Sequence, residues 1–527
     1  MNLFDANAVV GCTSDQRPDF LRVADLLAHM DRLGLGRALA WHIGAAGFQT
    51  VWGNEKLLAD LAATPGAEGR VFPAFVISPN VYYERGSLEW IREAMEQHGA
   101  RALRFSLARP EWSLDALEPV LEALLPLSPV LFLSTRDYLP KPAILALAER
   151  FPELPLVFTE AMWGHVGQML DLMRRRENLL IETSCLHTTG ALELFAGHYG
   201  AERLLFGTGF PSHQGAAIAE LARADLGEPE REAIAHGNLE RLLGLPKAAA
   251  VSSPGALSPF FGRLLAGEKL GCEVVDAHGH IGPMGSYVTV EQDTAAQARM
   301  ALDWMDRYGV TTMIISGDEA LHADPVEGNR VLEESLAEHG DRFRGYVAFN
   351  PLYAAETEPL LDDYFSPRTP AQFWVGFKLL CDYWRVPVTD PRFTPVWEYA
   401  NAHRLPILIH SWGGNMDAPS LLSEIAPAYP EAIFLLAHSG GSARDEAERL
   451  AMDHPNVYLE WCGSFTVPDS WEDTLARVGP ERVVFGTDAV PHSFIWETGR
   501  LLSQPFSEEQ FRQILGANMR TLLARRR

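Results

Sequence analysis

Residues that commonly bind metal ions stand in four segments of the second half of the chain. One segment, DAHGH, contains His278 and His280, and three others end in His410, His438 and Asp488. Side chains alternate along a strand, so His278 and His280 point to one face and can bind one ion together. Neutral imidazoles with one carboxylate suit Zn²⁺, Mn²⁺ or Fe²⁺. The pattern predicts a metal-dependent enzyme.

The expected chemistry is the activation of water. An ion held by about three or four protein ligands keeps a position open and lowers the pKa of bound water toward ~7. Asp488 could bind the ion, accept a proton from the water, or do both. A thiolate site is not expected, because the five cysteines are scattered and form no CxxC pair.

The elements that would bring these residues together follow a pattern that occurs twice. The first half opens with LFDANAVVG and closes with RLLFGTGFPSH, and the second opens with VVDAHGHIG and closes with RVVFGTDAVPH. Each copy spans about 250 residues, the usual size of a (β/α)₈ barrel. In the second copy, eight short apolar runs alternate with helical stretches, as buried parallel strands do. The carboxyl ends of such strands form one face, where the metal-binding residues would meet.

We therefore predict an α/β fold of two tandem (β/α)₈ TIM-like barrels. The predicted boundaries are residues 1–246 for the first barrel, 247–271 for a linker and 272–527 for the second barrel. The linker begins with a stretch rich in Ala, Ser and Pro, and its later part, FFGRLLAGEKLG, is compatible with a short helix.

The first copy lacks the metal-binding residues of the second. Aligning the copies places different residues at all five positions: Asn7 against His278, Val9 against His280, Leu133 against His410, Glu160 against His438 and Gly209 against Asp488. Valine and leucine offer no atom that binds a metal ion. We predict that residues 1–246 form a degenerate barrel without a metal site.

Composition excludes several classes of partner. The net charge of −25 argues against nucleic acid and anionic membranes. No apolar run approaches the ~20 residues that span a bilayer, and the N-terminal sequence shows no signal-peptide pattern. Scattered cysteines fit reduced thiols. We expect a cytoplasmic protein that acts on a small molecule.

The order of the motifs resembles the amidohydrolase superfamily, and within it the amidohydrolase-2 branch of aminocarboxymuconate-semialdehyde decarboxylase-like and related hydrolase enzymes. The motifs are DAHGH, GFK, ILIH, LLAHSGG, FGTD and a closing GAN, and they cover the whole second half. The resemblance implies one divalent ion, with Zn²⁺ expected and Mn²⁺ or Fe²⁺ as alternatives. The implied ligands are His278, His280, His410 and Asp488. The resemblance also implies that His438 faces the substrate or activates the water.

Lys378, in the motif GFKLL, has two interpretations. In relatives with two metal ions, a lysine at this place is carbamylated and bridges the ions. Alternatively, an unmodified Lys378 pairs with a substrate anion or an internal carboxylate. The first copy has Arg104 at the corresponding place in LRFSL. A positive charge therefore survives there without a metal site, which favours the electrostatic role and a single ion.

Substrate contacts are less clearly marked. Trp384, Trp412 and Trp461 follow predicted strands and would suit a flat or ring-containing substrate, although each could equally pack the core. His492 follows Asp488 and is a candidate substrate contact. Its counterpart His213 stands in the copy without a metal site, so a role in the fold is equally expected.

Three functions remain open. The first is hydrolysis of an ester, lactone or amide bond by metal-activated water. The second is nonoxidative decarboxylation of an aromatic or unsaturated acid at the same metal. The third is a non-catalytic scaffold. The fold alone cannot decide between them. We further expect the two barrels to form an intramolecular pseudo-dimer, with a homo-oligomer also open.

Overall fold

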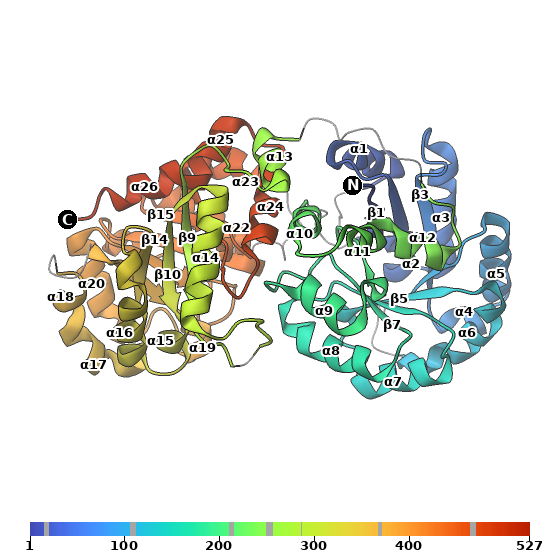
Figure 1. Cartoon of the computed structure of the whole chain (residues 1–527), viewed down its shortest axis with the longest axis horizontal. Helices are drawn as coiled ribbons and strands as arrows, with labels where there is room; N and C mark the ends of the chain where they lie inside the picture. Colours follow the sequence, from blue (N-terminus) through green and yellow to red (C-terminus); the bar gives the residue numbers. More distant parts are fainter. Residues whose placement is uncertain are drawn as a thin grey trace. The chain divides into compact units, whose positions relative to one another are not determined.

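The chain forms two compact units, Met1–Leu257 and Ser258–Arg527. The computed structural model describes residues 1–14, 20–105, 112–209, 215–248, 257–285, 287–366, 372–463 and 471–527. Each unit holds an eight-stranded parallel sheet whose strands follow chain order, with helices between them (Figure 1). This arrangement confirms the predicted tandem of α/β barrels. Among the described residues, no helix combines the length and apolar character needed to cross a membrane.

The first unit follows the predicted alternation of strands and helices. Its strands are β1 (Phe4–Val10), β2 (Arg37–His42), β3 (Val71–Ile77), β4 (Ala102–Phe105), β5 (Val130–Ser134), β6 (Leu156–Thr159), β7 (Leu179–Glu182) and β8 (Leu204–Leu205). Its helices are α1 (Val23–Leu33), α2 (Ile43–Gly47), α3 (Thr50–Ala63), α4 (Asn80–Tyr83), α5 (Ser87–His98), α6 (Glu118–Leu124), α7 (Lys141–Arg150), α8 (Val166–Arg175), α9 (Ala191–Tyr199), α10 (Ala216–Arg223), α11 (Glu228–Glu232) and α12 (Asn238–Leu243). The amide of Ala6 donates to the carbonyl of Phe206 at 2.9 Å and so joins the last strand to the first.

The second unit contains the eight strands expected from its apolar runs. They are β9 (Val274–Ile281), β10 (Val310–Gly317), β11 (Phe343–Ala348), β12 (Trp374–Leu379), β13 (Pro406–His410), β14 (Ile433–Ala437), β15 (Val457–Glu460) and β16 (Val483–Val484). The helices are α13 (Pro259–Ala266), α14 (Thr294–Tyr308), α15 (Asp318–His322), α16 (Pro325–Leu336), α17 (Ala354–Thr357), α18 (Leu361–Tyr364), α19 (Cys381–Trp384), α20 (Thr394–His403), α21 (Ile425–Ala428), α22 (Arg444–Asp453), α23 (Trp471–Val478), α24 (Phe494–Leu502), α25 (Glu508–Arg512) and α26 (Asn518–Leu523).

Helix α13 lies in the stretch predicted as a linker but packs on the second unit. The hydroxyl of Ser258 donates to the carbonyl of Leu502 at 3.0 Å, and the rings of Phe260 and Phe511 lie 5.6 Å apart. Residues 249–256, the rest of the Ala-, Ser- and Pro-rich stretch, lie outside the described residues.

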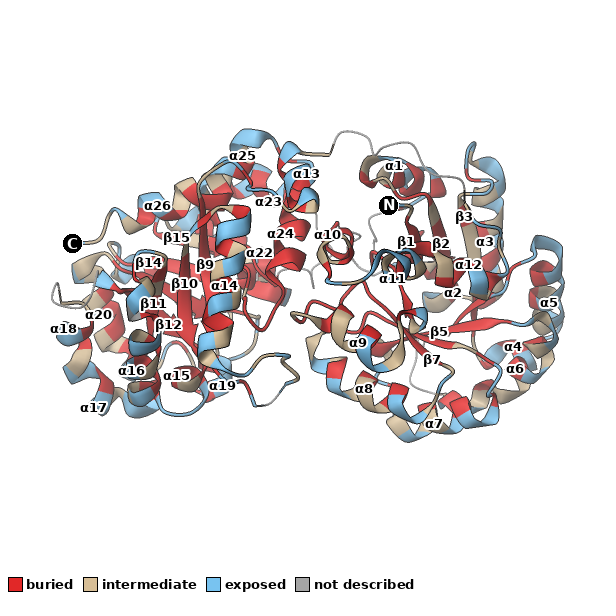
Figure 2. Ribbon diagram, in the orientation of Figure 1, coloured by how far each residue is buried: buried red, intermediate tan, exposed pale blue. Residues whose placement is uncertain are grey.

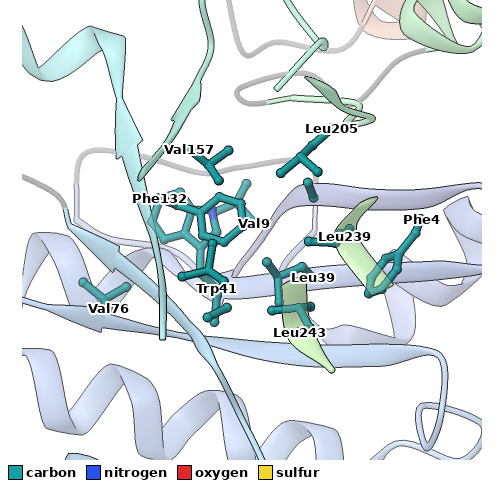
Figure 3. Packing of buried hydrophobic residues seen from close by; sticks show 14 of the residues in the cluster. Phe4, Val9, Leu39, Trp41, Val76, Phe132, Val157, Leu205, Leu239 and Leu243 are labelled. Carbon is teal, nitrogen blue, oxygen red and sulfur yellow. The ribbon is translucent and has the colours of Figure 1, made fainter. Parts of the chain in front are cut away.

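The strands are buried on both faces, and most helices are buried mainly on one side, whereas α24 is buried along its whole length (Figure 2). Such burial explains why the strands are nearly continuous apolar runs. In the first barrel, Val9, Trp41 and Phe132 belong to one interior cluster (Figure 3). The interior of the second barrel contains Val275 and Val375. Burying each such side chain stabilises the fold by about 1.5–3 kcal/mol.

The chain after β16 runs beside β9 and completes the second barrel. The amide of Ala277 donates to Phe485 at 2.9 Å, and the amide of Asp488 donates to the carbonyl of His278 at 2.7 Å. The amide of Val490 donates to the carbonyl of His280 at 2.9 Å. These backbone bonds hold Asp488 beside the two histidines of β9.

Candidate metal centre

Three side-chain atoms converge at the carboxyl ends of the strands of the second barrel. The Nε2 atoms of His278 and His280 are 3.2 Å apart, and Asp488 Oδ1 lies 3.3 and 3.2 Å from them. Two atoms that are each ~2.1 Å from one ion lie ~3.0 Å apart at an octahedral angle and ~3.4 Å apart at a tetrahedral angle. The three atoms therefore have the spacing of neighbouring ligands of one divalent ion.

A buried carboxylate lies behind each of these histidines. His278 Nδ1 is 3.0 Å from Glu460 Oε2, and His280 Nδ1 is 3.0 Å from Asp318 Oδ1. A carboxylate accepts the proton of Nδ1, so the lone pair of Nε2 can face an ion. Burial lowers the pKa of His280, but Asp318 and Asp488 raise it to about 9. A metal ion must therefore compete with a proton for this residue.

Asp488 carries a negative charge at neutral pH. Burial raises its pKa, but His278, His492 and His280 together hold it well below the usual value. The side chain is 18% exposed, whereas that of His278 is fully buried, so the three-atom group opens to solvent on the Asp488 side. His492, a predicted substrate contact, places Nε2 3.5 Å from Asp488 Oδ2. Its counterpart His213 lies outside the described residues.

His410 and His438 form a second pair, with 3.1 Å between His410 Nδ1 and His438 Nε2. Burial lowers the pKa of both, that of His438 to about 3, so both are neutral. His438 Nδ1 lies 3.3 Å from the carbonyl of Cys462, which can only accept, so the proton of His438 sits on Nδ1. His438 Nε2 is then an acceptor facing His410. His410, a predicted ligand, does not belong to the group of His278, His280 and Asp488.

Lys378 is buried next to the three-atom group. Its Nζ lies 2.7 Å from His278 Nε2. Burial lowers the pKa of Lys378, and the charge of Asp488 opposes that effect. Because Nζ lies so close to His278 Nε2, the amine can interact with any group bound at His278.

A further set of potential ligands surrounds Glu460. Its Oε2 lies 3.1 Å from Cys462 Sγ, which is 3.1 Å from His278 Nδ1 and 3.4 Å from His438 Nδ1. The first barrel builds the same arrangement without histidines: the hydroxyl of Ser184 donates to Glu182 at 2.8 Å. The arrangement therefore serves the barrel frame and orients His278.

Asp276, in the motif DAHGH, is also part of the frame. Its Oδ2 accepts a hydrogen bond from the hydroxyl of Thr487 at 2.5 Å, and its Oδ1 accepts from the amide of Thr487 at 3.2 Å. In the first barrel, the hydroxyl of Thr208 donates to Asp5 in the same way. This aspartate ties the first strand to the last in both barrels.

Aromatic side chains surround the approach to the three-atom group. Trp412 lies parallel to His410, with ring centres 6.1 Å apart, and is 5.0 Å from the ring of His438. Tyr383, 48% exposed, contacts His410 at 5.5 Å and His322 at 5.7 Å. Trp412 and Tyr383 thus form an aromatic wall beside the buried polar centre.

The other two tryptophans do not belong to this wall. Trp384 is buried and donates through Nε1 to the carbonyl of Leu321 at 2.8 Å. Trp461 is buried against Trp471, with ring centres 4.0 Å apart. Of the two interpretations left open for these tryptophans, their contacts favour packing between the barrel elements.

The equivalent place in the first barrel holds an internal ion pair. Arg104 Nη2 donates to Glu160 Oε1 at 3.1 Å, and Arg104 Nη1 donates to Asn7 Oδ1 at 3.0 Å. The guanidinium also lies 4.3 Å from the ring centre of Trp41. Arg104 corresponds to Lys378, and Glu160 to His438. The positive charge at the centre of this barrel is therefore supplied by the Arg104 side chain and needs no metal ion.

Glu160 is fully engaged within this network. Its Oε2 accepts from the hydroxyls of Ser134 at 2.5 Å and Thr159 at 2.7 Å. Burial raises its pKa, but Arg104 and these hydroxyls together lower the pKa by more than burial raises it, so Glu160 is ionised. Glu160 and its counterpart His438 share a left-handed backbone, with φ of 56° and 58°. The backbone of the site persists although its side chains have changed.

Comparison with known proteins identifies one family. The amidohydrolase family matches residues 19–245 and 275–525, so both units match it. No curated protein matches the chain.

Solved structures of similar fold cover about half of the chain. 5-Carboxyvanillate decarboxylase from Sphingomonas paucimobilis is 14% identical, with 48% of this chain and 99% of that chain covered and a TM-score of 0.37. Dihydroxybenzoic acid decarboxylase from Polaromonas sp. JS666, with bound manganese and 2-nitroresorcinol, is 18% identical, with 48% and 97% covered and a TM-score of 0.36. A probable 2-pyrone-4,6-dicarboxylic acid hydrolase from Acinetobacter baumannii is 14% identical, with 48% and 99% covered and a TM-score of 0.35.

Proposed function

Because the chain belongs to the amidohydrolase family, we propose that its second unit is a metal-dependent enzyme that hydrolyses an ester, lactone or amide bond of a small organic molecule. One observation carries this proposal: His278 Nε2, His280 Nε2 and Asp488 Oδ1 lie 3.2–3.3 Å apart, and the group they form opens to solvent on the side of Asp488. The ionised Asp488 can then accept a proton from water at that side.

The proposed ligands are His278, His280 and Asp488, and His410 is the fourth ligand that the resemblance implies, although here it lies against His438 rather than in this group. Zn²⁺ is the ion proposed, with Mn²⁺ and Fe²⁺ as alternatives that suit the same nitrogen and oxygen donors. When bound, such an ion polarises a carbonyl group and lowers the pKa of water. The first unit is proposed to bind no ion, since Arg104 pairs with Glu160 at its centre.

The remaining residues of the site have separate tasks. His438 keeps a proton on Nδ1 and has an acceptor Nε2 facing His410, so it can receive a proton during the reaction. Lys378 can donate to an oxygen of the substrate next to His278. Trp412 and Tyr383 offer flat surfaces for a planar substrate, and His492 lies where it could contact a group bound near Asp488.

Decarboxylation of an aromatic or unsaturated acid is the second candidate. It is favoured by the proximity of Lys378 Nζ to His278 Nε2, at 2.7 Å. A substrate carboxylate could be held there by the lysine ammonium and by an ion at the neighbouring histidines. Two of the enzymes of similar fold named above are decarboxylases. The site then needs a group that delivers a proton to carbon, and neutral His438 could do so after first taking up a proton on Nε2.

A single screen separates these reactions. The full-length protein, supplied with Zn²⁺ or Mn²⁺, would be incubated with lactones, esters, amides and aromatic acids, while both acid release and carbon dioxide release are followed. Hydrolysis without carbon dioxide supports the first candidate, and carbon dioxide release replaces it with the second. Turnover no higher than that of His278→Ala on every compound would contradict both and leave the non-catalytic scaffold.

A further inference from the structure

Of the two carboxylates that contact the histidines of β9, one has a counterpart in the first barrel and the other does not. Glu460, behind His278, has a direct counterpart in Glu182. Glu182 accepts from the amide and hydroxyl of Ser184, as Glu460 accepts from the amide and thiol of Cys462. A carboxylate that persists in a barrel without these histidines serves the frame.

Asp318, behind His280, has no such counterpart. The strand registers identify the equivalent position, because Val9 pairs with Trp41 as His280 pairs with Ser316. Two residues further along each strand, Ile43 takes the place of Asp318. The backbone makes the same close approach around this position in both barrels. A Cβ added to Gly328 would lie 2.2 Å from the amide nitrogen of Ala320 in α15. A Cβ added to Gly53 would lie 2.2 Å from the amide nitrogen of Ala45 in α2.

The histidine and the aspartate have therefore been exchanged together. In the first barrel, Val9 and Ile43 are both buried in one apolar cluster, 0% and 3% exposed (Figure 3 shows Val9). In the second barrel, His280 and Asp318 form a polar pair at 3.0 Å. Both positions are thus apolar in the first barrel and polar in the second, which links Asp318 to His280.

We propose that Asp318 is the positioning residue that prepares His280 to bind the metal ion, a role that rests on the function proposed above. Asp318 is fully buried, and its Oδ2 has no hydrogen-bond partner within the described part of the chain. Its Oδ1 has the Nδ1 atom of His280, 3.0 Å away, as its hydrogen-bond partner. This contact fixes the ring and directs the Nε2 lone pair toward His278 and Asp488.

The chain after β9 passes close to Asp318. Gly282, two residues after His280, has φ of 140°, and a Cβ there would lie 3.2 Å from both the Cβ and the amide of Asp318. Gly11, with φ of 89°, stands at the same place in the first barrel, so this close approach belongs to the common frame.

Metal affinity tests the proposal in the full-length protein. Zn²⁺ binding would be measured by competition with a chelator for the wild type, Asp318→Asn and Asp318→Ala. We expect the affinity to fall by about 10- to 100-fold, more for the alanine variant. In a His280→Val background, Asp318→Asn should change the affinity by less than about twofold, because its effect passes through His280. Glu448→Gln, which alters a buried carboxylate of the same unit whose partners include Thr474 and Arg477, is the matched control and should bind Zn²⁺ as the wild type does.

A stability measurement tests the pairing without any metal. His280→Val alone leaves Asp318 buried without its partner, whereas His280→Val/Asp318→Ile reproduces the Val9–Ile43 pair, which the fold accepts. We expect the double variant to unfold at a higher temperature than the single variant. A double variant no more stable than the single one would overturn the proposal.

The outcomes separate this proposal from the function on which it rests. A wild type that binds no Zn²⁺ would overturn the proposed metal centre and, with it, the role of Asp318. A wild type that binds Zn²⁺, with Asp318→Asn and Asp318→Ala within twofold of it, would overturn the role of Asp318 alone. A purely structural role would lower the unfolding temperature of both variants and leave the affinity of the folded protein unchanged.

Discussion

Replacing Arg104 with methionine should strongly destabilise the first barrel. Methionine has a similar length but no charge, so Glu160 would lose the cation 3.1 Å from its Oε1. Both side chains are buried, with exposures of 4% and 0%, so water cannot replace the lost partner. The variant tests whether the internal Arg104–Glu160 pair stabilises the first barrel.

The size of the effect follows from this burial. Removing one partner of a buried ion pair costs about 3–5 kcal/mol. For a unit of this size, each kcal/mol lowers the melting temperature by about 2–4 °C, so the expected loss is roughly 6–20 °C. Glu160 can limit the loss by taking up a proton, because burial raises its pKa once Arg104 is absent. The destabilisation should therefore be smaller at pH 5 than at pH 8.

Calorimetry of the full-length protein measures this change. The double variant Arg104→Met/Glu160→Gln removes both charges and should recover most of the loss. Arg150→Met is the control, because Arg150 pairs with Glu122 at the surface, where an ion pair contributes about 0–1 kcal/mol. The reasoning is refuted if Arg104→Met melts like the wild type, or if the double variant melts below the single one.

Three further predictions concern proton transfer, pH and the two units. His438→Asn should keep its metal ion but lose turnover by roughly 10²-fold or more, the usual scale for an acid–base group; loss of the ion on elemental analysis would instead make His438 a ligand. Burial raises the pKa of Glu182 to about 8 from 4.5, so the folded first unit holds a proton that the unfolded chain releases above pH 4.5. Stability should therefore fall as pH rises from 5 to 8, by up to ~1.4 kcal/mol per unit, and denaturation of Glu182→Gln should show a flatter profile. If the first unit supports the second as a pseudo-dimer partner, residues 258–527 alone should be poorly soluble or weakly active, and a soluble monomer of full activity and unchanged melting temperature would eliminate that proposal.

The architecture could be predicted because the same sequence pattern occurs in both halves of the chain. Short apolar runs with helical stretches between them specify buried parallel strands, and the repeated pattern fixed the number of barrels. The linker was harder to bound. Helix α13 lies in a stretch with linker composition, and only its contacts with Leu502 and Phe511 assign it to the second unit.

The candidate ligands could be named from strand ends, but their supporting residues could not. Asp318 follows the apolar run TTMIISG, and in sequence it resembles an ordinary acidic residue at the start of a helix. Its signal was positional, since it directly follows β10, the strand next to β9, and its counterpart Ile43 is apolar. Comparing the two copies at every strand end, rather than only at the ligands, would have found it.

The orientation of side chains in loops was beyond sequence reasoning. Trp384 and Trp412 both follow strands of the second barrel, yet Trp384 turns toward Leu321 and Trp412 lies over His438. Tyr383, next to Trp384, was not singled out, although it contacts His410. A single step along a short helix turns a side chain from the core to the site, and spacing alone cannot locate that step.

The metal content of the full-length protein tests the central claim most directly. Elemental analysis of the wild type, His278→Ala and Asn7→Ala, each purified with Zn²⁺, compares equivalent positions in the two barrels. The account predicts about one ion per chain in the wild type and in Asn7→Ala, and almost none in His278→Ala. Retention of the ion by His278→Ala, or its loss from Asn7→Ala, would contradict a single metal centre in the second barrel.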